Sequence, residues 1–277
     1  MKRLRKFIQC NSRLSVGLLM LLILAVIAVF APLLAPYDPY ILSDALVQAP
    51  GRGHMFGTDG LGRDIFSMIL YGSRTSLLIG VTAAMISAVI GIILGAVAGY
   101  FGNKADMIIG EGINVFMMMP TFFLILIIVA LFGSGIFNVM IVIGCTTWTG
   151  NAKLMRAQAM SLRNRTFIKA QEALGEQKLR ILIRHVIPNG IFPVIANTTM
   201  GIASAILTES SLAFLGLGDP NVVSWGQIVF EGKNYLTTGW WISTFGGIAI
   251  IYTVITFFFI GDGLNIILNP KLKNVIS

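Results

Sequence analysis

The stretch from Ser76 to Tyr100 reads SLLIGVTAAMISAVIGIILGAVAGY and contains no charged side chain. It is longer than the roughly 20 apolar residues that a helix needs to cross a bilayer. Of all 277 residues, 56% are hydrophobic and 12% are charged, and the mean hydropathy is +0.83. Because soluble domains carry about 25% charged residues, a water-soluble fold is excluded and most of the surface must face lipid.

Apolar runs of this kind predict an all-α integral membrane protein with six transmembrane helices. The runs are at about 16–35, 76–100, 113–132, 136–150, 190–208 and 242–260. The first run follows the basic segment MKRLRK, is about 20 residues long and has no A-x-A cleavage site, so we interpret it as a retained signal anchor. Pro120 is expected to kink the third span.

The basic residues predict the orientation of these spans. With residues 1–15 inside, the segments 101–112 and 151–189 and the C-terminal tail are also inside, whereas 36–75, 133–135 and 209–241 are outside. All but four of the 20 Lys and Arg residues then lie inside, the exceptions being Arg52, Arg63, Arg74 and Lys233. This is the positive-inside bias. The net charge of +8 therefore indicates topology rather than nucleic-acid binding, and both termini are expected in the bacterial cytoplasm.

The predicted spans contain no Asp, Glu, Lys, Arg or His, which argues against ion-coupled secondary transport. Cys10 and Cys145 lack CxxC spacing, and His54 and His185 lie in loops, so we expect no metal site, no catalytic site and no resident cofactor. The sequence contains no GxxxxGK[ST] motif. Uphill transport by this chain would therefore need energy from another polypeptide.

Small residues mark a packing face on the second span. Gly91, Gly95 and Gly99 recur at intervals of four, which lets another helix approach closely. That helix belongs either to this chain or to a second subunit.

The inside segment 151–189 predicts a short helix, a break and a second helix. FIKAQEAL (167–174) has good helix formers, and Gly175 provides a stop. LRILIRHVIP (179–188) then resumes helical character until Pro188 ends it. This helix pair contains no set of catalytic residues and lies at the inner membrane surface, where another protein could bind it.

The spacing of this segment resembles the EAA loop of ATP-binding cassette (ABC) importer permeases: EAA, three residues, Gly, nine residues, then I-x-L-P. Lys169, Ala170 and Gln171 stand at the EAA positions, and Gly175 and the segment 185–188 follow at the family spacing. The resemblance implies that the loop couples the permease to ATPase subunits. The coupling residues would be Lys169, Ala170, Glu172, Gly175, Arg180, His185 and Pro188.

A second motif narrows the resemblance to the peptide and nickel importer branch. FGTDGLGRDIFSMILYGSRTSL (56–77) is similar to FGTDxLGRDxxSRxxYGARxSL of that branch, and GAVAGYFG (95–102), ESSLAFLGLG (209–218), SWG (224–226) and GDGL (261–264) are similar to further stretches. Nine and six residues before Pro120, where the branch usually has Arg and Asp, this chain has Glu111 and Asn114.

The loop GTDGLGRD (57–64) allows two interpretations. From the residues alone it is a turn-rich loop in which Asp59 could cap the following helix. In the alternative, the loop receives a binding protein or shapes an outer gate, through Gly57, Thr58, Asp59, Gly62, Arg63 and Asp64.

The resemblance implies a type I importer permease fold, with residues 1–75 forming a tail, first helix and extracytoplasmic loop, and 76–277 forming the core permease. It implies a non-catalytic subunit that pairs with a second homologous permease, two ATPase subunits that bind ATP and Mg, and an extracytoplasmic binding protein. Di- or oligopeptides are the first choice of substrate, and chelated nickel or another metal is the alternative. An ATP-independent carrier or channel, or a membrane-bound enzyme or scaffold, would be a different class of protein.

Overall fold

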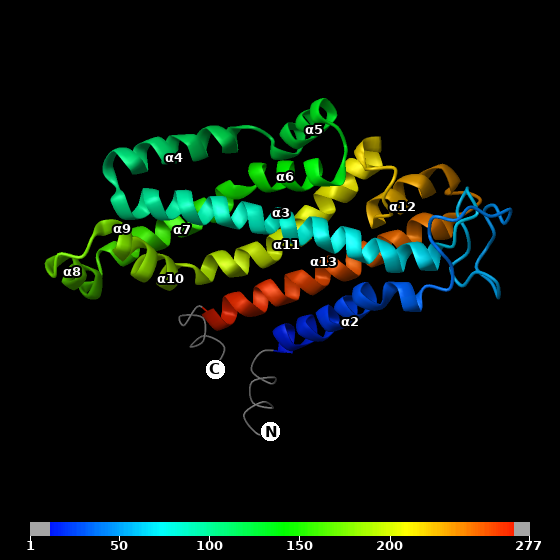
Figure 1. The fold of residues 1–277 in the computed structure, drawn as a ribbon, viewed down its shortest axis with the longest axis horizontal. Helices are drawn as coiled ribbons and strands as arrows, with labels where there is room; N and C mark the ends of the chain where they lie inside the picture. Colours follow the sequence, from blue (N-terminus) through cyan, green and yellow to red (C-terminus); the bar gives the residue numbers. More distant parts are fainter. Residues whose placement is uncertain (1–11, 269–277) are drawn as a thin grey trace, which may run out of the picture.

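The computed structural model describes residues 12–268, which form an elongated bundle of helices. The long helices α2 (Ser12–Leu34), α3 (Ile65–Phe101), α11 (Phe192–Leu212) and α13 (Trp240–Leu268) run along the bundle (Figure 1). These four, with α11 continuing through the π-helical turn η2 (Ala213–Leu217), are long and apolar enough to cross a membrane. Residues 1–11 of the basic N-terminal tail and residues 269–277 of the C-terminal tail fall outside the described residues.

The third predicted span is broken rather than kinked. It comprises α4 (Asn103–Met118) and α5 (Thr121–Phe132), which meet at 82°. Met119 is extended, with φ −86° and ψ 130°, because the ring of Pro120 disfavours a helical conformation in the residue before it. Counted as one broken span, this pair raises the number of spans from four to five.

The fourth predicted run does not form a single helix that is long enough by itself to count as a span. Its apolar part is α6 (Ile136–Thr146), which has 11 residues and rises only about 17 Å. A bilayer core is about 30 Å thick. The chain turns at Thr147 into the more polar α7 (Trp148–Arg163), where Thr147 has φ −98° and ψ 3°.

Several helices extend beyond the apolar runs that predicted them. For example, α3 begins at Ile65, where the Asp64 side chain accepts a hydrogen bond from the Ser67 backbone N–H at 2.8 Å. The expected division at residue 75 therefore falls inside α3. The longer helices also include Arg74, Glu209 and Asp262, so the charge-free description holds for the predicted apolar runs and not for the whole helices.

The glycines of α3 pack on α7 of the same chain. A Cβ built on Gly91 would lie 2.5 Å from Asn151 Cβ, and one on Gly95 or Gly99 would lie 2.3 Å from the carbonyl oxygen of Ala152 or Arg156. The two helix backbones are therefore nearly in contact, which only residues without a side chain permit.

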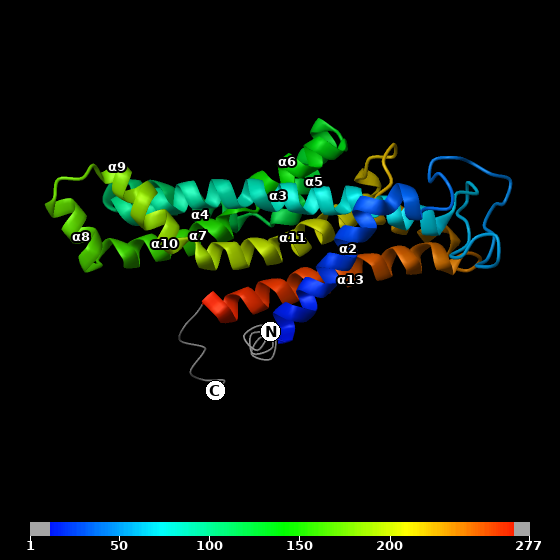
Figure 2. The same cartoon turned by 60° about the horizontal axis from the view of Figure 1, so that its bottom comes forward.

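The two ends of the bundle are built differently. Short helices form one end: α8 (Thr166–Ala173), α9 (Lys178–Ile181), the π-helical η1 (Leu182–Val186) and α10 (Ile187–Gly190). The loop 35–64, α12 (Trp225–Gly232) and the 3-10 turn η3 (Lys233–Tyr235) form the other. Figures 1 and 2 show α8 and this loop at opposite ends of the molecule. The two candidate functional segments are thus separated by the full length of α3.

Candidate functional site

The break between α8 and α9 is a Schellman motif centred on Gly175. The Gly175 N–H donates to the Glu172 carbonyl at 3.0 Å, and the Glu176 N–H donates to the Gln171 carbonyl at 3.1 Å. Gly175 has φ +80°, and nothing lies within 4 Å of a Cβ built on it. The predicted helix stop is confirmed, and its requirement for glycine is conformational rather than steric.

Pro188 does not end the second helix, contrary to the sequence prediction. It lies in the first turn of α10, where its missing N–H is tolerated. The preceding π-helical turn η1 absorbs the irregularity. Ile187 and Ile191 both keep right-handed helical dihedrals, so the chain leads from α9 directly into α11. A movement of α9 can therefore be transmitted to a membrane-spanning helix.

Apolar side chains anchor this helix pair to the bundle. Ile168 of α8 and Ile181 of α9 are fully buried, and they join a cluster with Tyr100 of α3 and Met155 of α7. The Tyr100 hydroxyl donates to Glu172 Oε1 at 3.1 Å. The pair is thus seated on both α3 and α7.

The outer side of the pair presents an apolar and basic surface. Leu174 is 80% exposed, and Phe167, Leu179 and Ile183 are exposed as well. Exposed basic side chains surround them at Lys169, Lys178, Arg180 and Arg184. An exposed apolar patch with a polar rim is typical of a protein-binding surface.

Some of the predicted coupling residues lie on this exposed surface, and others contact the rest of the protein. Lys169, Ala170, Gly175, Arg180 and Pro188 are exposed. Glu172 is exposed too, but it is tied to α3 through Tyr100. His185 is half-buried, with Nε2 3.3 Å from Glu176 Oε2. The first group is available to a partner, whereas Glu172 fixes α8 to α3 through Tyr100 and His185 lies beside Glu176 within the same segment.

The loop 57–64 at the other end is folded around buried polar groups. Asp59 is 1% exposed and accepts hydrogen bonds from the Leu61 and Arg63 N–H groups and, at 2.6 Å, from Arg63 Nε. Arg63 also pairs with Glu231 of α12. Burial raises the pKa of the Glu231 carboxyl, and Arg63 opposes this shift. Arg63 therefore links the loop to α12.

Asp64, and not Asp59, caps the following helix, which corrects the sequence interpretation. Asp64 Oδ2 accepts hydrogen bonds from the backbone and hydroxyl of Ser67, and Oδ1 lies 2.9 Å from His54 Nδ1. Thr58 is fully buried and accepts a hydrogen bond from Trp241 through its carbonyl. Gly57 and Gly62 lie in the turns of the loop. The motif thus fixes the shape of the loop more than it forms its surface.

Comparison with known proteins identifies the fold. Residues 91–274 match the family of binding-protein-dependent transport system inner membrane components. Residues 11–50 match the N-terminal membrane domain of oligopeptide transport permease C. The chain belongs to this permease family. It is therefore a multi-pass inner membrane transport subunit of a binding-protein-dependent system, and ATPase and substrate-binding partners follow from that membership.

Individual permeases are similar in sequence to this chain over most of its length. It is 36% identical to the di/tripeptide transport system permease protein DppC of Pseudomonas aeruginosa, over 93% of this chain and 88% of that protein. It is 34% identical to the oligopeptide transport system permease protein OppC of Bacillus subtilis, over 95% and 87%. The inward-facing methionine ABC transporter MetNI has a similar fold, with a TM-score of 0.55, 16% identity and coverage of 73% of this chain and 96% of that one.

A polar cavity midway along the permease escaped the sequence analysis. It is lined by α3, the junction of α6 and α7, and α11, and its polar side chains include Ser87, Asn151 and Asn197. In the sequence these residues are scattered single polar positions in apolar or mixed segments. Only the packing of three helices brings them together.

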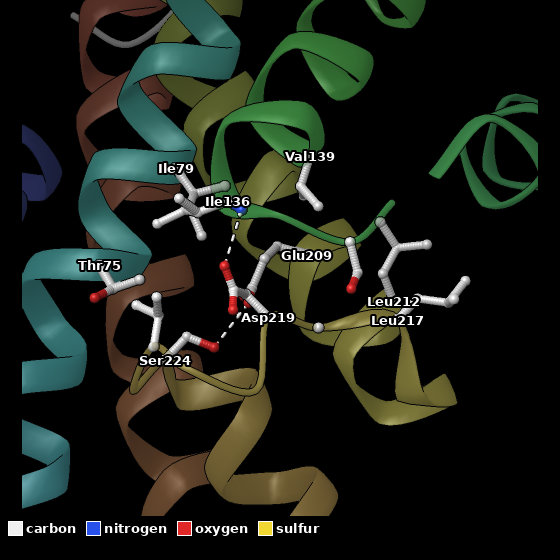
Figure 3. Close-up of a pocket in the computed structure, with 12 residues that line it drawn as sticks. Thr75, Ile79, Ile136, Val139, Glu209, Leu212, Leu217, Asp219 and Ser224 are labelled. Carbon is white, nitrogen blue, oxygen red and sulfur yellow. Dashed lines mark hydrogen bonds between the residues drawn. The ribbon is translucent and has the colours of Figure 1, made fainter. Parts of the chain in front are cut away.

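A second missed feature is the buried acid Glu209 near the end of α11. It is 5% exposed, and its Oε1 accepts a hydrogen bond from the Ser224 hydroxyl at 2.8 Å. In the same pocket, the Ile136 N–H donates to Asp219 Oδ2 at 3.4 Å (Figure 3). These bonds tie α11 to the start of α12, and the loop after η2 to the start of α6. Sequence reasoning placed Glu209 just outside the membrane span.

Glu111 and Asn114, where the branch usually has Arg and Asp, line a cavity of about 160 Å³ between α4 and α7. Lys153 and an ion pair between Arg156 and Asp106 complete its charged lining. In that pair, Arg156 Nη2 lies 2.8 Å from Asp106 Oδ2. The two positions therefore face charged residues of both signs.

Proposed function

We propose that this chain is one of two permease subunits of an ABC importer that carries di- or oligopeptides across the cytoplasmic membrane. The observation that carries the proposal is the exposed α8–α9 pair at one end of a permease of this family. Its surface is apolar and basic, and a buried apolar cluster seats it on α3 and α7. The named peptide transport permeases at 34% and 36% identity support the choice of peptides as substrate.

Energy would enter through the exposed side of α8 and α9. Two separate ATPase subunits would bind ATP and Mg and close on each other, and the permease pair would supply no chemistry. Because α9 leads through η1 and α10 into α11, movement of the loop would shift α11 as part of a rigid body. The pathway would then open alternately to the two sides of the membrane.

The loop 35–64 would face the binding protein. It lies at the end of the bundle opposite α8 (Figure 1), and exposed apolar side chains such as Leu42, Leu46, Met55 and Leu61 cover it. The link from Arg63 to Glu231 would transmit docking at this surface to α12. In this proposal the residues 57–64 hold the shape of the loop that receives the binding protein, and so they support an outer gate indirectly.

Replacing Gly175 with Val tests the coupling role. A β-branched residue cannot adopt φ +80° without strain, so the angle between α8 and α9 should change. We expect the assembled importer to lose most of the ATP hydrolysis that substrate-loaded binding protein stimulates, while the chain still inserts and assembles. ATPase assays on the purified complex measure this loss.

Gly175→Asn is the matched control. Asn tolerates the left-handed conformation far better than Val does, and a side chain at this position meets no neighbour. Gly175→Asn should therefore retain most of the stimulation. Equal stimulation in the Val and Asn variants would refute a conformational role for Gly175.

The substrate is tested in a strain that lacks the gene for this chain. Growth on dipeptides as the sole source of a required amino acid should fail and return with the wild-type gene. Loss of nickel-dependent urease or hydrogenase activity, with unimpaired growth on peptides, would instead identify chelated nickel as the substrate. Uptake by the purified chain in liposomes without ATPase subunits would contradict the ABC mechanism.

A further inference from the structure

A cavity of about 230 Å³ lies halfway between the two ends of the bundle, at the middle of α3 and α11. Its polar lining comes from Ser87, Thr147, Asn151, Asn197, Ser204 and Thr208, and none of its lining residues is charged. A water molecule occupies about 30 Å³ of the liquid, so the cavity is several times the size of one water. The cavity is therefore large enough for a short stretch of backbone.

Three of the lining residues, Ser87, Asn151 and Asn197, are joined by hydrogen bonds. The Asn151 amide donates to Ser87 Oγ at 3.2 Å, and the Asn197 amide donates to Asn151 Oδ1 at 2.8 Å. Asn151 is 4% exposed and joins α7 to both α3 and α11. Buried polar groups in a membrane-spanning bundle are costly unless they have partners, so this network fixes the side chain of Asn197 in one orientation.

Two groups on this network remain available to a ligand. Asn197 Oδ1 has no hydrogen-bond partner among residues 12–268, and Asn197 is only half-buried. Ser87 accepts a bond from Asn151 and keeps its own hydroxyl proton as a donor. The cavity thus offers one neutral acceptor and one neutral donor, on two residues that are both hydrogen-bonded to Asn151.

We propose that this cavity binds the backbone amide of a peptide in transit, with Asn197 Oδ1 accepting the amide N–H and Ser87 donating to a carbonyl. A peptide unit carries one donor and one acceptor, which matches this pair. The lining offers no counter-charge to a peptide terminus, so the amide is the group that it can recognise. This inference rests on the proposed function, because it names the part of the substrate that the permease recognises.

Backbone recognition has a consequence for specificity. The amide is common to all peptides, so a site that binds it accepts substrates whatever their side chains. The apolar part of the lining consists of Ala84, Met200, Gly201 and Ala205, of which only Met200 has a large side chain, and Met adapts to partners of different shape.

The test compares two substrates in the complete importer, reconstituted in proteoliposomes with its ATPase subunits and binding protein. One is a dipeptide, and the other is the same dipeptide methylated on the peptide nitrogen, which removes the N–H donor. The ratio of their ATP-driven uptake is measured for the wild type, Asn197→Leu and Thr199→Val. Thr199 is the matched control, because its hydroxyl bonds to the Ile195 carbonyl and it does not line the cavity.

We expect the wild type and Thr199→Val to prefer the unmethylated dipeptide by roughly five- to tenfold beyond the preference of the isolated binding protein, as the loss of one hydrogen bond predicts. Asn197→Leu should abolish this extra preference. Because the binding protein contributes the same factor to every variant, a change in the ratio belongs to the permease.

An unchanged ratio in Asn197→Leu, or a wild-type ratio equal to that of the binding protein alone, would overturn the amide site. If Asn197→Leu does not assemble, as judged by stimulated ATP hydrolysis, Asn197→Ser provides the deciding ratio because its shorter side chain withdraws the acceptor. A wild-type complex that accumulates neither dipeptide would overturn the proposed function itself, so the two failures are distinguishable.

Discussion

Arg74 near the start of α3 compensates for a proline in the neighbouring helix. Pro32 lies inside α2 and has no N–H, so the carbonyl of Ala28 lacks its usual helical donor. Arg74 Nε donates to that carbonyl at 2.6 Å, and its Nη2 donates to the Val29 carbonyl at 3.1 Å. A charged side chain thus satisfies the one carbonyl, that of Ala28, which Pro32 leaves without a helical donor.

Arg74→Leu should therefore destabilise the permease. Leaving the Ala28 carbonyl without a donor costs about 1–3 kcal/mol, which thermal unfolding of the purified complex would detect. In a Pro32→Ala background the helix supplies its own donor, so the same substitution should cost less. An equal loss of stability in both backgrounds would show that Arg74 acts in some other way.

The contact between α3 and α7 depends on glycine at each closest approach. A Cβ on Gly95 would lie 2.3 Å from the Ala152 carbonyl oxygen, and a backbone atom cannot move aside without displacing α7. Gly95→Ala is expected to destabilise the complex by about 1–3 kcal/mol and to lower its melting temperature. Gly247→Ala in α13 is the control, since open space surrounds that position. Equal effects of the two substitutions would contradict a packing role for Gly95.

The two ends of the molecule should lie on opposite sides of the membrane. Once Cys10 and Cys145 are replaced with Ser, single cysteines can be placed by Met55→Cys in the outer loop and Leu174→Cys in the coupling unit. Both positions are well exposed, at 64% and 80%. An impermeant maleimide should label intact spheroplasts at position 55 alone, and permeabilised cells at both positions. Labelling of position 174 in intact spheroplasts would reverse the topology that the basic residues predict.

The sequence predicted most of what depends on local chemistry. Apolar length identified a membrane protein, and the left-handed stop at Gly175 followed from residue type. It did not show how sharply the third run bends or that the fourth run turns at Thr147, because α5 and α6 are as apolar as the long helices and only the structure shows where they are interrupted. It also missed the helix cap at Asp64, because Asp59 has the same chemistry and only the fold shows which one adjoins the first turn.

By itself, then, the sequence determined that the chain is an integral membrane protein and which of its segments carry the basic charge. It also determined that the chain has an EAA-type loop in which a glycine ends a helix. These properties are sums over neighbouring residues or depend on the backbone of a single one. The tertiary structure alone decided that Ser87, Asn151 and Asn197 line one cavity. It also decided that Arg63 pairs with Glu231 and that Arg74 donates to the Ala28 carbonyl. Each of these contacts joins different helices or a helix and a distant loop, and no local pattern encodes the packing that brings them together.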